Sequence, residues 1–157
     1  MAEHLEISEG NKEEKYKLLY KQIKGLVEVE KDPVAVMANV SAMIHETFSN
    51  LWTGFYRNID GTLVLGPFQG PLACTRIAYG KGVCGTAWKE KKTIIVPDTD
   101  KFPGHIACSS ESRSEIVTPV IRNDEVVAVI DIDSRDLSSY DETDRVWLEK
   151  IAILLPF

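Results

Sequence analysis

The sequence has no long hydrophobic run and no excess of basic residues. No stretch approaches the roughly 20 consecutive apolar residues of a membrane-spanning helix, and the start of the chain lacks the uninterrupted apolar core of a signal peptide. The 157 residues carry a net charge of -6. Because nucleic acids and anionic membranes attract basic surfaces, this charge argues against both as partners. We therefore expect a cytoplasmic protein.

Cysteines are few, and their spacing excludes the common redox and zinc motifs. Cys74, Cys84 and Cys108 form no C-x-x-C pair, which is the spacing of zinc ribbons and thioredoxins. An odd number of cysteines in a reducing compartment is not a structural disulfide framework. Each cysteine is therefore a buried hydrophobic residue, a metal ligand or a redox group. His105 lies near Cys108 in the sequence, so a scattered metal site with one further cysteine stays open.

The order of predicted elements indicates one domain in which helices cover both faces of a sheet. Residues 1–11 are polar and are expected to form a flexible tail, and 12–157 to form the domain. Asp60-Gly61, between two runs rich in aromatic and β-branched residues, predicts a β-hairpin. The predicted helices span 13–30, 33–48, a short segment around Cys84 and a last segment from Asp141, and Asp32 followed by Pro33 predicts the cap and the first position of the second helix. The predicted strands span 51–57, 62–68, 75–78, 93–96, 115–122 and 125–133. This order predicts an α+β fold with a mostly antiparallel sheet of about six strands.

Two patterns predict burial in detail. The nearly continuous apolar run over 126–132 suits a central strand that is covered on both faces. In the last helix, Val146, Trp147, Ile151 and Leu154 fit one buried face.

The three cysteines differ in their sequence surroundings. Cys108 lies in a long segment, 98–112, that has few periodic apolar positions, so we expect an accessible thiol in a functional loop. Cys74 lies in another connection, and two loop cysteines could approach each other on folding. A thiolate that is oxidised to a sulfenic acid and then trapped by a second thiol is established chemistry. Cys84 lies in a short, apolar, helical context, where an inert buried thiol is the stronger interpretation.

Three carboxylates and two aromatic residues are further candidates. Asp131 and Asp133 alternate along one strand and share a face. Two like charges there are costly unless they bind a cation or share a proton, or unless the strand has already reached solvent. Glu115 begins the neighbouring strand, and three acids around one pocket would suit a ligand ammonium and raise one carboxyl pKa. Trp52 and Tyr56 share a face of the first strand, either as ordinary core or as pocket walls.

Together these segments resemble a known family, the free methionine-(R)-sulfoxide reductases, which are single GAF domains. The resemblance covers nearly the whole chain after the first fifteen or so residues, and its cysteine contexts are more specific than the turns that all GAF domains share. The segments that carry it are Trp52-Thr53-Gly54-Phe55-Tyr56, Gly66-Pro67-Phe68-Gln69-Gly70, Cys74, Gly80-Lys81-Gly82-Val83-Cys84-Gly85, Val96-Pro97-Asp98, His105-Ile106-Ala107-Cys108, Ser114-Glu115-Ile116-Val117 and Asp131-Ile132-Asp133-Ser134.

The resemblance implies an activity and a role for each matching position. Cys108 would attack the sulfoxide sulfur and become a sulfenic acid, Cys74 would resolve that acid to a disulfide, and Cys84 would be an auxiliary resolving thiol. The other matching residues would hold the substrate: Glu115, Asp131 and Asp133 would bind it and protonate the departing oxygen, and Trp52 and Tyr56 would surround its S-methyl group. No metal or organic cofactor is implied. A thioredoxin-like dithiol would supply the electrons. The sequence does not determine the oligomeric state, and the helix over 13–30 would be the candidate surface for a homodimer.

Three other functions remain open at the level of sequence. A non-catalytic GAF module that senses a small ligand explains the fold but leaves the cysteines unexplained. A metal-binding protein would use His105, Cys108 and one more cysteine, in a spacing that fits no common site. A structural domain with incidental thiols would have unreactive cysteines of ordinary pKa.

Overall fold

Four α-helices, one 3-10 helix and six strands make up the part of the chain that the computed structural model describes, residues 4–106 and 108–157. In chain order they are α1 (Lys12–Val29), α2 (Pro33–Phe48), β1 (Trp52–Ile59), β2 (Thr62–Gln69), β3 (Arg76–Ile77), α3 (Gly82–Glu90), β4 (Ile94–Val96), η1 (Thr99–Lys101), β5 (Ser114–Arg122), β6 (Glu125–Ser134) and α4 (Glu142–Leu154). The expected order of elements and the α+β class are confirmed. The segment predicted as a long loop contains the short helix η1.

One six-stranded sheet organises the fold, with the strand order β3-β2-β1-β6-β5-β4. Every neighbouring pair is antiparallel. The apolar strand β6 lies between β1 and β5 and is covered on both faces, as its composition predicted. Ile130 and Ile132 pack into the core on one face, and Val126 and Val129 pack on the other.

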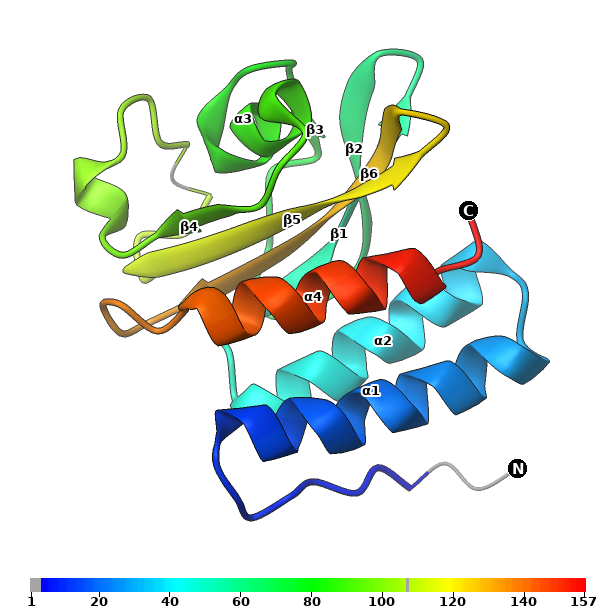
Figure 1. The fold of residues 1–157 in the computed structure, drawn as a ribbon. Coiled ribbons are helices and arrows are strands. Elements are labelled where there is room, and N and C mark those ends of the chain that lie inside the picture. Colours follow the sequence, from blue (N-terminus) through cyan, green and yellow to red (C-terminus); the bar gives the residue numbers. More distant parts are fainter. Residues whose placement is uncertain (1–3, 107) are drawn as a thin grey trace.

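Three helices lie on one side of the sheet, with α2 and α4 against the strands and α1 packed on these two helices. Figure 1 shows α1, α2 and α4 side by side below the strands. Asp32 caps α2 as the sequence predicted, with its carboxylate accepting a hydrogen bond from the Ala35 amide at 2.9 Å. Ile44 of α2 and Leu148 of α4 are buried on the side of the sheet, and Ile23 of α1, which packs on these two helices, belongs to the same core cluster. This face supplies most of the hydrophobic core.

The opposite face is covered by the short helix α3 and by the loop that leads to β5 (Figure 1). A second, smaller cluster packs there and includes Tyr56, Val83, Cys84 and Val117. Because this cover is thinner, the second face leaves room for polar residues of β5 and β6. No helix among the described residues is long and apolar enough to cross a bilayer.

The prediction for α4 was wrong at one position. Val146 is 38 % exposed, and Leu148 and Ala152 are buried beside Trp147 and Ile151. Successive helical residues are rotated by about 100°, so Val146 turns away from the sheet while Leu148 turns towards it.

The segment before α1 runs along that helix. The Glu6 amide donates a hydrogen bond to Gln22 Oε1 at 2.9 Å, and Gln22 Nε2 donates to the Glu6 carbonyl at 2.8 Å. Both contacts are exposed. The flexible tail, as predicted from composition, stays a prediction.

Candidate active site

A disulfide joins the two cysteines that lie in loops. Cys74 follows β2, Cys108 precedes β5, and the bond closes across 34 residues with the Cα atoms 5.6 Å apart. Cys108 is exposed and Cys74 is half-buried. The chain thus brings together the two thiols that sequence alone left as possible neighbours, and it places them where another molecule can reach them.

A pocket lies beside this disulfide, and its volume is about 560 Å³ when the open solvent at its mouth is included. Cys108 borders it, and Cys74 lies next to its wall, where the Tyr56 hydroxyl donates a hydrogen bond to the Cys74 carbonyl at 2.9 Å. The other lining residues include six of the positions that the sequence singled out: Trp52, Tyr56, Cys84, Glu115, Asp131 and Asp133. All eight candidates therefore meet in one place.

Strand register places the three carboxylates at the floor of the pocket. Glu115 of β5 lies directly opposite Asp133 of β6, and Asp131 lies two residues further along β6 on the same face. Glu115 and Asp131 are each 6 % exposed, so β6 has not emerged into solvent there. Asp133 is half-buried and accepts a hydrogen bond from the Ser112 hydroxyl at 2.6 Å. Of the alternatives for these acids, a shared proton or a bound cation remains.

Crowding and burial change the acidity of this floor. Burial, followed by the charge of Asp133, raises the pKa of Glu115 to about 8. Burial also raises the pKa of Asp131 well above its usual range, with Glu115 as the next cause. The pKa of Asp133 is raised by burial and then by Asp131. At neutral pH the floor therefore holds protons, and Glu115 is a carboxylic acid that can donate one.

Aromatic rings form one wall of the pocket. The rings of Trp52 and Tyr56 stack with centroids 5.9 Å apart, and Trp52 also stacks on Phe68 at 5.1 Å. Gly54 lies between them on the strand and opposite Asp131. A Cβ atom at Gly54 would overlap Phe68 and lie 2.7 Å from the Trp52 ring, so glycine permits this stack. Trp52 and Tyr56 are buried at 5 % and 1 % exposure, so they are both core and pocket wall.

Cys84 is the free thiol of the site. It lies in the first turn of α3, is 3 % exposed, and its sulfur lies within 4.8 Å of carboxylate oxygens of Glu115 and Asp131. Burial, followed by the charge of Asp131, raises the pKa of the Cys84 thiol well above its usual range. Cys84 is thus neutral and buried, as its apolar sequence context predicted, and it also belongs to the pocket.

Sequence reasoning missed two polar partners of the acids. His105 Nε2 lies 3.3 Å from Glu115 Oε2, and burial lowers the pKa of His105. Ser112 donates to Asp133. Both residues lie in the loop before β5, where no periodicity indicates the direction of a side chain. The sequence-based metal set of His105 and Cys108 is not assembled here, because the Cys108 sulfur is bonded to Cys74.

The fold and the site together define a class of protein: a GAF domain with a thiol–disulfide pair beside a carboxylate-lined pocket. Residues 31–155 match the GAF domain family. The chain is 54% identical to GAF domain-containing protein A of Dictyostelium discoideum, over 99% of both chains.

Two further relatives carry a more specific description. The chain is 44% identical to the free methionine-R-sulfoxide reductase of Saccharomyces cerevisiae, over 98% of this chain and 91% of that protein. The crystal structure of the free methionine-R-sulfoxide reductase of Neisseria meningitidis, in complex with its substrate, superposes with a TM-score of 0.96 at 45% identity and covers 99% of this chain and 94% of that one. The chain therefore belongs to the free methionine-R-sulfoxide reductase family of GAF-domain proteins.

Proposed function

We propose that this protein reduces free L-methionine-R-sulfoxide to L-methionine, with Cys108 as the nucleophile. One observation carries the proposal: an exposed loop cysteine, paired with a second one, lies at the mouth of a pocket whose floor holds a protonated carboxylic acid. Thiol chemistry on a sulfoxide needs both a nucleophilic sulfur and a proton for the departing oxygen. The family relationship gives the substrate class.

The shape and charge of the pocket suit a free amino acid. Asp131 and Asp133 offer acceptor oxygens for the ammonium group, and Trp52 and Tyr56 offer an apolar wall for the S-methyl group. A methionine sulfoxide inside a peptide has no such ammonium and continues as chain on both sides. The enclosed floor therefore favours the free amino acid over the peptide-bound residue.

The first step transfers the oxygen. The Cys108 thiolate attacks the sulfoxide sulfur, while Glu115 donates its proton to the oxygen. The oxygen and this proton end on the Cys108 sulfur as a sulfenic acid, and methionine leaves. The substrate sulfur gains two electrons and Cys108 loses two. His105 contacts Glu115 and is placed to return a proton to it from solvent.

The second step forms the disulfide that the structure contains. The Cys74 thiol attacks the sulfenic acid, the S–S bond forms, and water leaves with the oxygen. The Tyr56 hydroxyl holds the Cys74 carbonyl beside the pocket wall and so keeps this thiol near Cys108. In this scheme Cys84 stays reduced and buried during a normal cycle, and it serves as a resolving thiol only after a movement of α3.

The third step needs an external dithiol. A thioredoxin-like protein attacks the exposed Cys108 sulfur, forms a mixed disulfide and then leaves oxidised, which restores both thiols. We place this cycle in the cytoplasm, where such reductants keep thiols reduced. A homodimer formed through α1 is a further proposal that rests on the sequence alone.

The test measures methionine release from the purified, reduced protein. Wild type with free L-methionine-R-sulfoxide and thioredoxin should turn over, the S-sulfoxide and a peptide-bound R-sulfoxide should not react, and Cys108→Ser should release no methionine. Without reductant, wild type should release one methionine per chain and form the disulfide. Ser110→Ala, in the same exposed loop, is the matched control and should behave as wild type. If reduced wild type does not turn over, the proposal fails and a ligand-sensing GAF module takes its place.

A further inference from the structure

Three buried side chains at the bottom of the pocket form a compact set of metal-binding donors. The Cys84 sulfur and one carboxylate oxygen each from Glu115 and Asp131 lie within 4.8 Å of one another. They lie on α3, β5 and β6, so a helix and two strands hold them together and their positions do not depend on a loop. Zinc in proteins lies about 2.0–2.3 Å from sulfur, nitrogen and oxygen ligands. Side-chain shifts on the order of 1 Å would bring these three donors onto one ion.

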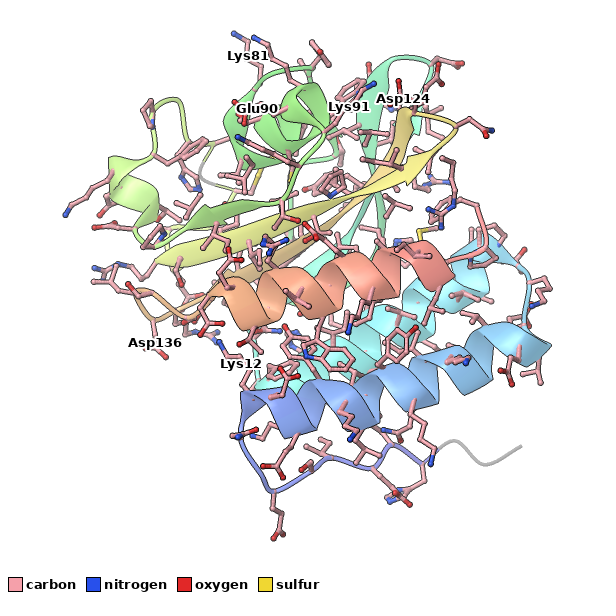
Figure 2. All side chains as sticks on the ribbon, viewed as in Figure 1. Lys12, Lys81, Glu90, Lys91, Asp124 and Asp136 are labelled. Carbon is pink, nitrogen blue, oxygen red and sulfur yellow. A yellow bond between two sulfur atoms is a disulfide. The ribbon has the colours of Figure 1, made fainter. Side chains whose placement is uncertain are left out.

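One of these donors lacks the partner that burial requires. Asp131 is 6 % exposed, and its fully buried Oδ1 atom has no hydrogen-bond partner among the residues that the structure describes. Leaving such a group unpaired is costly. In the described part of the chain, no lysine or arginine forms an ion pair with Glu115, Asp131 or Asp133. Lys81, which borders the mouth, is exposed, and Figure 2 shows it at the outer edge of the domain by the start of α3. The floor therefore has an unpaired acceptor oxygen and, among the described residues, no basic side chain beside it.

A fourth donor lies at the edge of this set. His105 Nε2 is 3.3 Å from Glu115 Oε2. A neutral imidazole offers one ring nitrogen lone pair to a metal. One sulfur, one imidazole nitrogen and two carboxylate oxygens match the ligand types and the coordination number of zinc.

We propose that Cys84, Glu115 and Asp131, with His105 at the rim, form a binding site for a thiophilic divalent cation of the Zn²⁺ type, and that an ion bound there blocks the pocket. Mg²⁺ and Ca²⁺ are excluded because they take six or more oxygen ligands and no thiolate. Binding displaces the Cys84 thiol proton and the protons held by the carboxyls into solvent, and it changes no oxidation state.

An ion at this position occupies the floor on which a ligand of the pocket must rest. Glu115 and Asp131 cannot ligate the ion and also serve a bound molecule. The site is therefore inhibitory, and its occupancy follows the supply of free Zn²⁺. It differs from the cysteine pair in that it uses only Cys84, so it is available in the oxidised protein as well as in the reduced one.

The oxidised protein makes the test specific. Of the three cysteines, two are joined in the disulfide, so Cys84 is the free thiol. Oxidised, metal-free protein should bind one Zn²⁺ per chain in a titration against a competing chelator. Co²⁺ in place of Zn²⁺ should give the absorption band of a cobalt–thiolate bond. Cys84→Ser should abolish that band and weaken Zn²⁺ binding roughly a hundredfold, and Glu111→Gln, an exposed acid on the neighbouring loop, should bind as wild type.

A second variant and a separate assay protect the conclusion. Asp131→Asn keeps the thiol and should also weaken Zn²⁺ binding, so the test holds if Cys84→Ser does not fold. Absence of one-to-one binding to oxidised wild type, or a Cys84→Ser protein that binds as tightly, would overturn the proposal. Because this assay measures binding without turnover, its outcome is separate from that of the reductase assay, which is run with EDTA present.

Discussion

Two buried aspartates, one on each face of the sheet, meet opposite conditions. Asp144, on the three-helix face, is 2 % exposed and accepts hydrogen bonds from Lys12 Nζ and the Tyr16 hydroxyl at 2.6 Å and from the Asp141 amide at 2.8 Å. Lys12 extends from the start of α1 towards the start of α4 (Figure 2). Asp131, on the α3 face, is nearly as buried, yet no donor in the described part of the chain bonds its Oδ1.

The difference separates two uses of a buried charge. On the three-helix face the carboxylate joins α1 to α4 and its charge is matched, so it is part of the structure. On the α3 face burial, and after it the neighbouring acids, raise the carboxyl pKa values, and Asp131 Oδ1 leaves its capacity to accept a hydrogen bond unused. The same fold supplies hydrogen-bond donors to buried Asp144. The unpaired oxygen of Asp131 therefore indicates a site for a ligand.

The largest effect should come from the α3 face. Glu115→Gln removes the proposed proton donor but keeps its shape, so turnover should fall by about 10²- to 10⁴-fold. Because the variant also removes a buried ionisable group, the thermal midpoint should stay or rise. Single-turnover methionine release and thermal unfolding on the same preparation check both parts. A variant that melts well below wild type would place Glu115 with Asp144 as a structural acid.

A substitution of the buried aspartate on the three-helix face should lower stability and leave activity unchanged. Asp144→Ala leaves Tyr16 and Lys12 without their acceptor and should lower the free energy of unfolding by about 2–3 kcal/mol. This corresponds to a fall of about 5–10 °C in the thermal midpoint. Urea unfolding gives the free energy, and methionine release per folded molecule should match wild type. Reduced turnover in fully folded protein would contradict the separation of the two faces.

Stability should depend on pH through the α3 face. In the unfolded chain Glu115 loses its proton near the ordinary glutamate pKa, whereas in the folded chain it does so at about 8. The stabilising contribution is therefore fully present below the unfolded pKa and is lost as pH rises towards 8, with a slope of up to about 1.4 kcal/mol per pH unit. Urea unfolding across this range should show the decline, and Glu115→Gln should make it shallower, since the raised pKa values of Asp131 and Asp133 still contribute. A profile that is identical in both proteins would rule out this assignment.

The smallest expected effects are those of two tyrosine substitutions, one on each face of the sheet. Tyr56→Phe loses the hydrogen bond to the Cys74 carbonyl, so disulfide formation after methionine release should slow several-fold, consistent with about 0.5–1.5 kcal/mol. Tyr16→Phe loses a hydrogen bond to Asp144 and should lower stability by a similar amount, with the disulfide rate unchanged. Stopped-flow detection of free thiols, alongside urea unfolding, distinguishes the two. Equal disulfide rates in both variants would show that Tyr56 acts only through packing.

The order of elements could be predicted because the spacing of apolar residues along the sequence differs between helices and strands. The run over 126–132 identified β6 as central, and Asp32-Pro33 located the start of α2. The prediction for Val146 was wrong because adjacent positions of a helix differ by about 100°, and a few apolar residues do not fix the buried direction more finely.

The part of the site that lies on strands could be predicted from the sequence. Alternation placed Asp131 and Asp133 on one face, and antiparallel pairing brought Glu115 beside them. The contacts made by loop residues could not be predicted from alternation. The pairing of Cys74 with Cys108 followed only from the family resemblance, and the contacts of His105 and Ser112 depend on a loop path that no local pattern encodes.

The position of the disulfide has a consequence for the covalent topology of the chain. The ring that it closes contains the two edge strands of the sheet, β3 and β4, together with α3 and η1, which belong to the cover of the α3 face. A closed loop of this length restricts the unfolded chain by an amount on the order of 4 kcal/mol. The oxidised and reduced proteins therefore share one fold but differ in how readily that cover opens, and amide exchange in α3 should report the redox state while exchange in α2 does not.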